Sequence, residues 1–169
     1  CPEGRYEDAI GSHECDCASA GHYPSVDRTV QLQCAPGTFQ NETCKESCMS
    51  CPTGTIAVGS GSSYCSCVSA GHYASADKTT ELVCTPGTYQ PATCQDGCLE
   101  CPAGKYEEST GSHECNCAAA GYYPSSDKTQ QLPCESGTYQ GNACEMACLA
   151  CPNGRYAPYV GSHNCTCAA

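Results

Sequence analysis

Cysteine is the residue type in this chain with the most chemical potential, since 21 of the 169 residues are Cys. C-x-x-C spacing occurs at Cys48–Cys51, Cys98–Cys101 and Cys148–Cys151. Such spacing is typical of zinc sites and of thiol–disulfide exchange centres. A zinc site needs four ligands that stay reduced, and an exchange centre would occur once rather than at three places. We therefore predict structural disulfides here, with no metal and no cofactor.

Serine and histidine stand together in a sequence that resembles a nucleophile beside its general base. The triplet G-S-H occurs at 11–13, 111–113 and 161–163. Side chains adjacent in sequence rarely reach hydrogen-bond geometry with each other, and the second copy, Gly61-Ser62-Ser63, has no histidine. His22 and His72 are likewise replaced by Tyr122, which excludes a metal ligand shared by every copy. We predict no catalytic residue and expect the protein not to be an enzyme.

Two asparagines lie in N-x-T sequences, which can accept N-linked glycans. Asn41 is followed by Glu42 and Thr43 in a polar loop. Asn164 precedes Cys165 and Thr166, and the central cysteine makes this second site a poorer acceptor. The sequence predicts a glycoprotein that carries covalent glycans at Asn41 and Asn164.

The cysteines recur with a strict period of fifty residues. Each copy begins with C-P-x-G and continues with cysteines at +14, +16, +33, +43 and +47, without an insertion or deletion. Self-similarity at a fixed period indicates a tandem repeat. We predict three complete cysteine-rich repeats, at 1–50, 51–100 and 101–150, and a partial fourth repeat at 151–169 that belongs to a longer array.

Each complete repeat has six cysteines, an even number that permits three disulfides. The partial repeat has three, so Cys167 is expected to lack its partner within this sequence. The cysteines predicted to form disulfides are Cys1, Cys15, Cys17, Cys34, Cys44, Cys48, Cys51, Cys65, Cys67, Cys84, Cys94, Cys98, Cys101, Cys115, Cys117, Cys134, Cys144, Cys148, Cys151 and Cys165.

Large apolar residues are too scarce to build a conventional core. Leu, Ile, Val and Phe number 14 of 169, or 8%, whereas chains with less than about 20% of them are typically disordered. A disulfide that closes a loop of about 15 residues contributes roughly 3 kcal/mol in the chain-entropy model. We predict that disulfides stabilise each repeat, and that Leu32, Leu82 and Leu132, each two residues before a cysteine, form a minimal core.

Two turn sequences position the cysteines of each repeat. C-P-x-G suits a type I turn, and C-x-x-G-T-[FY]-Q favours a type II turn where Pro and Gly occupy its middle positions, although Ser136 indicates that the proline is dispensable. In the extended C-x-C segment both sulfurs point to one face and bond different partners. The S-x-D-[RK]-T sequence has no apolar periodicity and indicates an exposed loop. The predicted fold class is small disulfide-rich repeats: a tandem array of cysteine-rich modules with short β-hairpins and turns, little helix, and the form of an elongated rod.

These motifs together resemble a known class of extracellular module. The C-P-x-G-x-Y opening with a cysteine at +14, and the later C-x-x-G-T-[FY] with its next cysteine at +10, look like the cysteine-rich modules of tumour-necrosis-factor receptors and the ephrin-receptor-like repeats. The resemblance covers the whole chain, but sixteen residues separate Cys17 from Cys34, more than in the compact receptor module.

The resemblance implies a disulfide pairing of one–two, three–five and four–six. In the first repeat this pairing joins Cys1 to Cys15, Cys17 to Cys44 and Cys34 to Cys48. An EGF-like alternative keeps the first bond but joins Cys34 to Cys44 and Cys17 to Cys48. Six cysteines allow 15 pairings, so the sequence alone leaves both open.

The dependence on disulfides predicts an extracellular or cell-surface protein, since cytosolic thiols are kept reduced. The net charge of −11 disfavours nucleic acid and anionic lipid as partners. No apolar run long enough for membrane insertion occurs in this sequence.

Two classes of function fit a fixed period. In the first, the repeats form a structural component of an extracellular fibre, sheath or surface appendage and self-associate into a filament. In the second, they form the stalk or ligand-binding ectodomain of a receptor or adhesion protein. Receptor modules usually vary in loop length, so the constant length of loops 24–31, 74–81 and 124–131 favours the fibre and predicts that these loops contact neighbouring chains.

Overall fold

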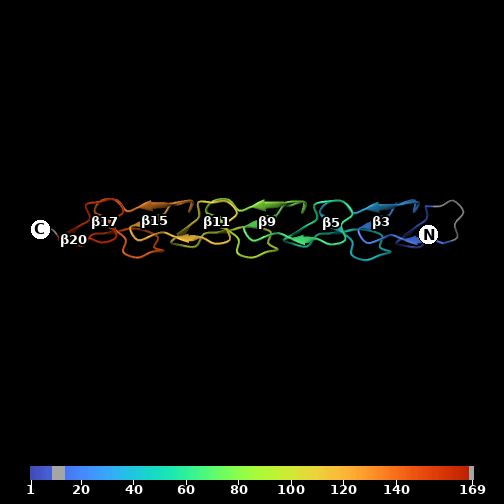
Figure 1. The fold of residues 1–169 in the computed structure, drawn as a ribbon, viewed down its shortest axis with the longest axis horizontal. Helices are drawn as coiled ribbons and strands as arrows, with labels where there is room; N and C mark the ends of the chain where they lie inside the picture. Colours follow the sequence, from blue (N-terminus) through green and yellow to red (C-terminus); the bar gives the residue numbers. More distant parts are fainter. Residues whose placement is uncertain (9–13, 168–169) are drawn as a thin grey trace. The chain divides into compact units, whose positions relative to one another are not determined.

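The computed structural model describes residues 1–8 and 14–167. These residues contain no helix, and their regular structure consists of strands of two or three residues (Figure 1). The predicted fold class of disulfide-rich repeats with short hairpins and little helix is therefore confirmed, while the rod-like form stays a prediction. The chain divides into two compact units, one of Cys1–Leu82 with Thr93–Gly97 and one of Val83–Ala92 with Cys98–Ala169. The predicted repeat boundaries at 50, 100 and 150 concern the period of the sequence and stay predictions.

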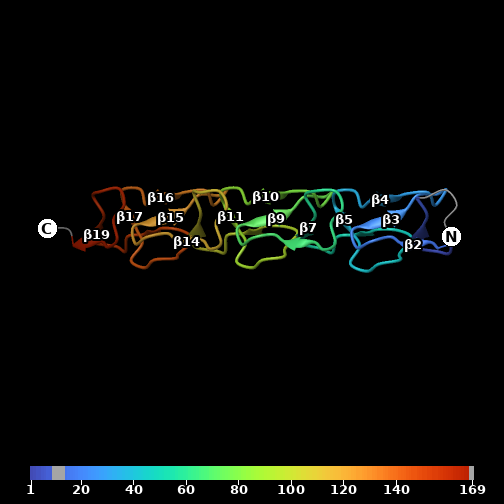
Figure 2. The same cartoon turned by 45° about the vertical axis from the view of Figure 1, so that its right-hand side comes forward.

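The strands of the first unit follow the cysteine pattern. They are β1 (Arg5–Tyr6), β2 (Asp16–Cys17), β3 (His22–Pro24), β4 (Gln31–Gln33), β5 (Thr38–Phe39), β6 (Met49–Ser50), β7 (Thr55–Ile56), β8 (Ser66–Cys67) and β9 (His72–Ala74). Strand β10 (Glu81–Val83) lies where the two units divide. Figure 2 shows β3 and β4 side by side as an antiparallel pair, in which Tyr23 is opposite Leu32.

The strands of the second unit continue the same fifty-residue period. They are β11 (Thr88–Tyr89), β12 (Leu99–Glu100), β13 (Lys105–Tyr106), β14 (Asn116–Cys117), β15 (Tyr122–Pro124), β16 (Gln131–Pro133), β17 (Thr138–Tyr139), β18 (Leu149–Ala150), β19 (Arg155–Tyr156) and β20 (Thr166–Cys167). Each sheet has two strands, and the register repeats: Arg5 is opposite Cys17 as Lys105 is opposite Cys117.

The C-P-x-G turn differs from the predicted type I turn. The amide of Arg5 donates to the Pro2 carbonyl at 3.2 Å, so the turn begins at Pro2 and Gly4 is its third residue. Gly4 has φ of 73°, a value that type I turns do not have at this position. A Cβ at Gly4 would collide with the Cys44 carbonyl oxygen. Glycine is therefore required at this position by the backbone conformation and by close packing. The turn lies one residue later in the sequence than predicted.

The C-x-x-G-T turn agrees with the prediction. Thr38 N donates to Ala35 O at 3.0 Å, and Gly37 has φ of 77° after Pro36, as in a type II turn. The same hydrogen bond joins Thr138 to Glu135 with Ser136 in the place of the proline. Proline is thus dispensable here, as predicted.

The buried interior consists of half-cystines and small residues rather than leucines. Cys34, Cys84 and Cys134 are fully buried, as are Ala18, Val68 and Ala118. In the first unit, Ile56, Val68 and Ala74 form a small apolar cluster.

The prediction of a leucine core is wrong. Leu32 and Leu82 are each 40% exposed, and Leu132 is only half-buried. Leu32 lies on a two-stranded sheet opposite Tyr23, which is itself only half-buried. A sheet of two strands has no further layer to cover its outer face, so a regularly spaced leucine on such a sheet does not become buried.

Candidate functional site: disulfides and repeat junctions

Ten disulfides join 20 of the described cysteines, and the three complete repeats share the same pairing pattern. In the first repeat, Cys1 bonds Cys15, Cys17 bonds Cys44, and Cys34 bonds Cys48. The remaining bonds are Cys51–Cys65, Cys67–Cys94, Cys84–Cys98, Cys101–Cys115, Cys117–Cys144, Cys134–Cys148 and Cys151–Cys165. This is the pairing implied by the receptor-module resemblance and not the EGF-like alternative. Cys167 is free and exposed.

Each C-x-x-C sequence is divided between two disulfides. Cys48 bonds Cys34, whereas Cys51 bonds Cys65, so both sulfurs of the sequence are already committed. The described residues hold one close group of possible metal ligands, Cys1, Glu7 and Cys15. Two of its members are bonded to each other and offer no thiolate to a metal.

The C-P-x-G turn of the first repeat packs on the backbone beside the Cys17–Cys44 disulfide. Ala18 N donates to Gly4 O at 3.0 Å, and Cys44 N donates to Ala18 O at 2.9 Å. Cys44 itself has φ of 58°, in the left-handed region. These contacts fix the position of the Cys17–Cys44 bond relative to the first turn.

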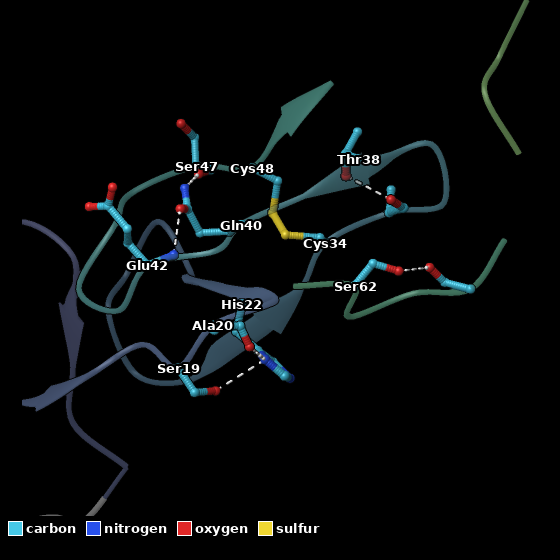
Figure 3. Close-up of a disulfide and its surroundings, with 12 residues drawn as sticks. Ser19, Ala20, His22, Cys34, Thr38, Gln40, Glu42, Ser47, Cys48 and Ser62 are labelled. Carbon is cyan, nitrogen blue, oxygen red and sulfur yellow. Dashed lines mark hydrogen bonds between the residues drawn. A yellow bond between two sulfur atoms is a disulfide. The ribbon is translucent and has the colours of Figure 1, made fainter. Parts of the chain in front are cut away.

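A buried glutamine organises the loop closed by the Cys34–Cys48 disulfide (Figure 3). Gln40 Nε2 donates to Ser47 O at 2.8 Å, and Gln40 Oε1 accepts from Glu42 N at 3.1 Å. Gln140 makes the same pair of bonds, to Ala147 O and Asn142 N, at 2.8 and 3.1 Å. This glutamine was not among the predicted site residues, although it recurs at 40, 90 and 140.

The aspartate of the S-x-D-[RK]-T loop is exposed, as predicted, whereas the serine is half-buried in the first two copies and buried in the third. The loop is also internally bonded. Asp27 Oδ1 accepts from Ser25 Oγ at 2.6 Å and from Thr29 Oγ1 at 2.9 Å. The hydrogen bond from Ser25, followed by those from Thr29, lowers the pKa of Asp27 below its ordinary value. Asp77 and Asp127 show the same shift, because Ser75 and Ser125 donate to them in the same way.

The basic residue of this loop ties it to the start of the same repeat. Arg28 has φ of 56°, and its carbonyl accepts from Glu7 N at 2.9 Å. Its guanidinium donates to the Cys1 carbonyl and to Glu46 at 2.9 Å. Lys78 likewise donates to the Cys51 carbonyl. The length of the loop is therefore set by contacts within the chain.

The junction between successive repeats is made by the same backbone hydrogen bonds at three places. In the first unit, Gly37 N donates to Ala57 O at 2.8 Å, and Gly61 N donates to Cys34 O at 2.8 Å. Gln40 N also donates to Ser62 O at 3.1 Å, so the residue that organises the disulfide loop contacts the next repeat as well. The second unit repeats these bonds twice, as Gly87–Glu107, Gly111–Cys84 and Gln90–Ser112, and as Gly137–Ala157, Gly161–Cys134 and Gln140–Ser162.

Glycine permits the close backbone approach at these junctions. A Cβ at Gly37 would collide with the Asp77 carbonyl oxygen, and one at Gly87 would collide with that of Asp127. The S-x-D loop of one repeat thus lies against the turn of the repeat before it. An insertion in loop 74–81 would disturb this contact, so the constant loop length has a cause within a single chain.

The two glycosylation sequences have different surroundings. Asn41, Glu42 and Thr43 are all exposed, in the loop after β5. In the second sequence, Cys165 is buried, and Thr166 Oγ1 donates to the Tyr156 carbonyl at 3.2 Å. Glycosylation at both sites stays a prediction, and both asparagines are exposed.

The serine–histidine triplets take part in local structure where the structure describes them. The triplet at 11–13 lies outside the described residues. Ser162 Oγ donates to Tyr159 O at 2.6 Å, and its carbonyl belongs to a repeat junction. The unrelated His22 lies with Nδ1 3.1 Å from Ser19 Oγ and 3.2 Å from Ala20 O (Figure 3).

Within residues 1–8 and 14–167, no helix has the length and hydropathy needed to cross a bilayer. Models of known protein families give no match to this chain. Curated proteins give no significant match either. The chain is thus described by its own architecture, a tandem array of cysteine-rich, disulfide-bonded hairpin modules.

Proposed function

We propose that the chain is a structural component of an extracellular fibre, sheath or cell-surface appendage, in which the disulfide-bonded repeats self-associate into a filament. The observation that supports this function best is the repeat junction, since the same three backbone hydrogen bonds recur at three places. Equivalent junctions recur every fifty residues along the chain, and repetition of equivalent surfaces is what a regular assembly of many chains requires.

The chemistry of the chain fits such a setting. Ten disulfides indicate an oxidising compartment, and an extracellular or cell-surface location follows in this proposal. Glycans at the exposed Asn41 would face solvent. The role uses surfaces rather than an active site, so we propose that the protein is not an enzyme.

The constant loop length supports the fibre less directly than the sequence suggested. Loops 24–31, 74–81 and 124–131 are held by contacts within their own chain, so their length does not require a neighbouring chain. Self-association is therefore supported by the repetition of the surfaces and not by the absence of insertions.

The second candidate is the stalk or ligand-binding ectodomain of a receptor or adhesion protein. The one–two, three–five, four–six disulfide pairing favours it, because that pairing is implied by the resemblance to tumour-necrosis-factor-receptor modules. In such a protein the hydrogen-bonded junctions would hold a binding region at a distance from the membrane.

Negative-stain electron microscopy of the native material, combined with light scattering of the purified chain, distinguishes the two functions. The proposal predicts filaments with an axial periodicity and a particle mass that increases with concentration. Single chains at every concentration would overturn the fibre and favour the ectodomain.

A further inference from the structure

The loop between β19 and β20, in the second unit, leaves three consecutive apolar residues open to solvent. Tyr159 is 76% exposed and Val160 is 62% exposed, and the exposed Pro158 precedes them. Single exposed apolar side chains are common on protein surfaces, whereas a contiguous group marks a place where something binds. With Asn164 these residues line a hollow of about 260 Å³, which we call the Tyr159 hollow.

The residues around the Tyr159 hollow are uncharged, although the chain as a whole carries −11. None of them is Asp, Glu, Lys or Arg. Beside the apolar residues, the walls offer the hydroxyl groups of Ser162 and Thr166 and the imidazole of His163. An apolar wall with a few polar groups suits a neutral ligand that has a hydrocarbon face and hydrogen-bonding groups, such as a sugar ring. The volume lies just below the range of about 300–1,000 Å³ for drug-sized ligands, so one sugar ring is the appropriate size.

The hollow also contains a predicted attachment point for a sugar. Asn164 is the asparagine of an N-x-T sequence, and it lines the hollow as an exposed residue. A ligand bonded to this side chain would therefore begin at the wall of the hollow itself.

Comparison among the four copies of the repeat shows that the attachment sequence and the apolar loop occur together. The pair Asn164 and Thr166 has the equivalents Glu14 and Asp16, Tyr64 and Ser66, and Glu114 and Asn116. The run Pro-Tyr-Val at 158–160 has the equivalents Asp-Ala-Ile at 8–10, Val-Gly-Ser at 58–60 and Glu-Ser-Thr at 108–110. The fourth copy alone has both features, and the folded chain brings both to one hollow.

The loop is held in place by bonds within the second unit. Ser162 Oγ donates to Tyr159 O at 2.6 Å, and Gly161 N donates to Cys134 O at 2.7 Å. The Cys151–Cys165 disulfide fixes the residue that follows Asn164. A loop that is already ordered loses little conformational freedom when it binds a ligand.

We propose that the Tyr159 hollow holds the first N-acetylglucosamine of a glycan attached to Asn164. This role goes beyond the proposed structural function and depends on the predicted glycosylation of the chain. The hydrocarbon face of the sugar covers Tyr159 and Val160, and its hydroxyl and acetamido groups meet the polar wall at Ser162 and His163. The glycan thus shields an apolar patch that would otherwise stay in contact with water.

The covalent step is the transfer of an oligosaccharide from a lipid-linked diphosphate donor. The Asn164 Nδ2 atom forms a bond to the anomeric carbon of the sugar and loses one proton to solvent. The bond between that carbon and the diphosphate oxygen breaks, and the lipid diphosphate leaves with the electron pair. Transfer precedes folding, when Cys165 is not yet bonded to Cys151, and the sugar reaches the hollow as the loop folds. Partial occupancy of Asn164 is sufficient for the tests below.

Nuclear magnetic resonance of the full chain, secreted by eukaryotic cells, tests the contact directly. An endoglycosidase trims each glycan to one N-acetylglucosamine, and a sugar on the exposed Asn41 serves as the reference. We expect nuclear Overhauser effects between the Tyr159 ring and the sugar on Asn164, whose protons should lie upfield of those on Asn41. Equal chemical shifts for the two sugars, with no effect from Tyr159, would overturn the proposal.

A pair of tyrosine variants tests whether the contact orders the loop. In the glycosylated chain, Tyr159→Ser should speed exchange of the Gly161 amide by about fivefold or more. The matched control is Tyr64→Ser, which removes a tyrosine that is 71% exposed and lies outside the hollow, and it should stay within about twofold. In an Asn164→Gln background, which has no sugar at this position, Tyr159→Ser should also stay within about twofold. The same effect with and without the sugar would show that Tyr159 acts on the loop alone and would overturn the proposal.

Mass spectrometry of glycopeptides separates the proposal from the predictions around it. A glycan on Asn41 with Asn164 always bare overturns the role of the hollow, and two bare asparagines overturn the predicted glycosylation as well. Filament formation is measured by microscopy on the same samples, so the proposed fibre function is supported or lost independently of either result. Non-reducing peptide maps that show the ten disulfides establish that each variant is folded.

Discussion

At the scale of single residues, buried polar side chains stabilise this chain in the way that apolar side chains stabilise larger domains. Gln140 is buried and satisfies one carbonyl and one amide of the loop closed by the Cys134–Cys148 disulfide. A buried hydrogen-bonding group without its partner costs about 1–3 kcal/mol. A recurring buried glutamine is therefore as important to this loop as a core leucine is elsewhere.

Replacement of this glutamine is expected to loosen its loop. Gln140→Leu should speed amide exchange at Asn142 by about tenfold or more, because removal of the partner leaves that amide and the Ala147 carbonyl unsatisfied. Gln130→Leu is the matched control, since Gln130 is exposed. Hydrogen exchange followed by mass spectrometry measures both, and equal protection in the two variants would contradict this role.

The S-x-D loops are expected to lose their local structure in acid. Because hydrogen bonds lower the pKa of Asp77 in the folded chain, its carboxylate stabilises the loop at pH values above the ordinary pKa of 3.8. That contribution is lost as the pH falls through the lower folded pKa. NMR titration of the Asp77 carboxyl group, together with exchange of the Thr79 amide, measures the effect.

An Asp77→Asn variant serves as the control for this titration, because its side chain does not ionise. Its loop protection should stay constant over the same acid range. A carboxyl group at Asp77 that titrates at or above the ordinary value would refute the hydrogen-bonded loop.

At the scale of elements, the hairpins and loops are held in place by backbone contacts at glycine rather than by side-chain packing. Gly37 combines φ of 77° with close approach to the Asp77 carbonyl. Its amide and carbonyl both bond across the junction, to Ala57 O at 2.8 Å and Cys51 N at 3.0 Å. One glycine thus joins the end of one repeat to the start of the next.

Gly37→Ala is expected to open the first junction. The left-handed conformation costs an alanine roughly 1–2 kcal/mol, and the collision with the Asp77 carbonyl adds to this cost. The Gly61 amide, which donates across the junction, should exchange faster, and proteases should cut near residues 51–62. Gly59→Ala is the matched control, because a Cβ there meets no atom within 4 Å. Equal exchange in both variants would show that the junction does not depend on this glycine.

At the scale of the whole molecule, covalent bonds replace the hydrophobic core. Loops of 14 and 27 residues are closed by the three disulfides of each repeat. Each such bond contributes about 3–4 kcal/mol in the chain-entropy model, whereas a typical domain has about 5–15 kcal/mol of stability in total. Folding of the array therefore depends on oxidation.

Full reduction is expected to unfold every repeat. After reduction and alkylation, the far-ultraviolet circular dichroism spectrum should become that of an unstructured chain, and resistance to proteases should disappear. The oxidised chain under the same conditions is the control. Survival of structure after full reduction would mean that a core independent of the disulfides exists.

The period of fifty residues, the disulfide-bonded class, the absence of a conventional core and the turn at Ala35–Thr38 could all be predicted from the sequence. These features follow from cysteine spacing, composition and Pro-Gly chemistry, all of which are local or periodic in the sequence. The disulfide pairing stayed open at that level, since spacing alone does not say which sulfurs meet.

Which residues are buried, and which distant residues bond each other, became known only from the folded chain. Leu32 recurs regularly but lies exposed, because burial depends on whether another layer covers its sheet. The Gln40 amide donates to the Ser62 carbonyl, and Gly37 lies against the Asp77 carbonyl, so both contacts join residues that are distant in the chain. No local pattern encodes such distances, so the repeat junctions became visible only in the folded chain.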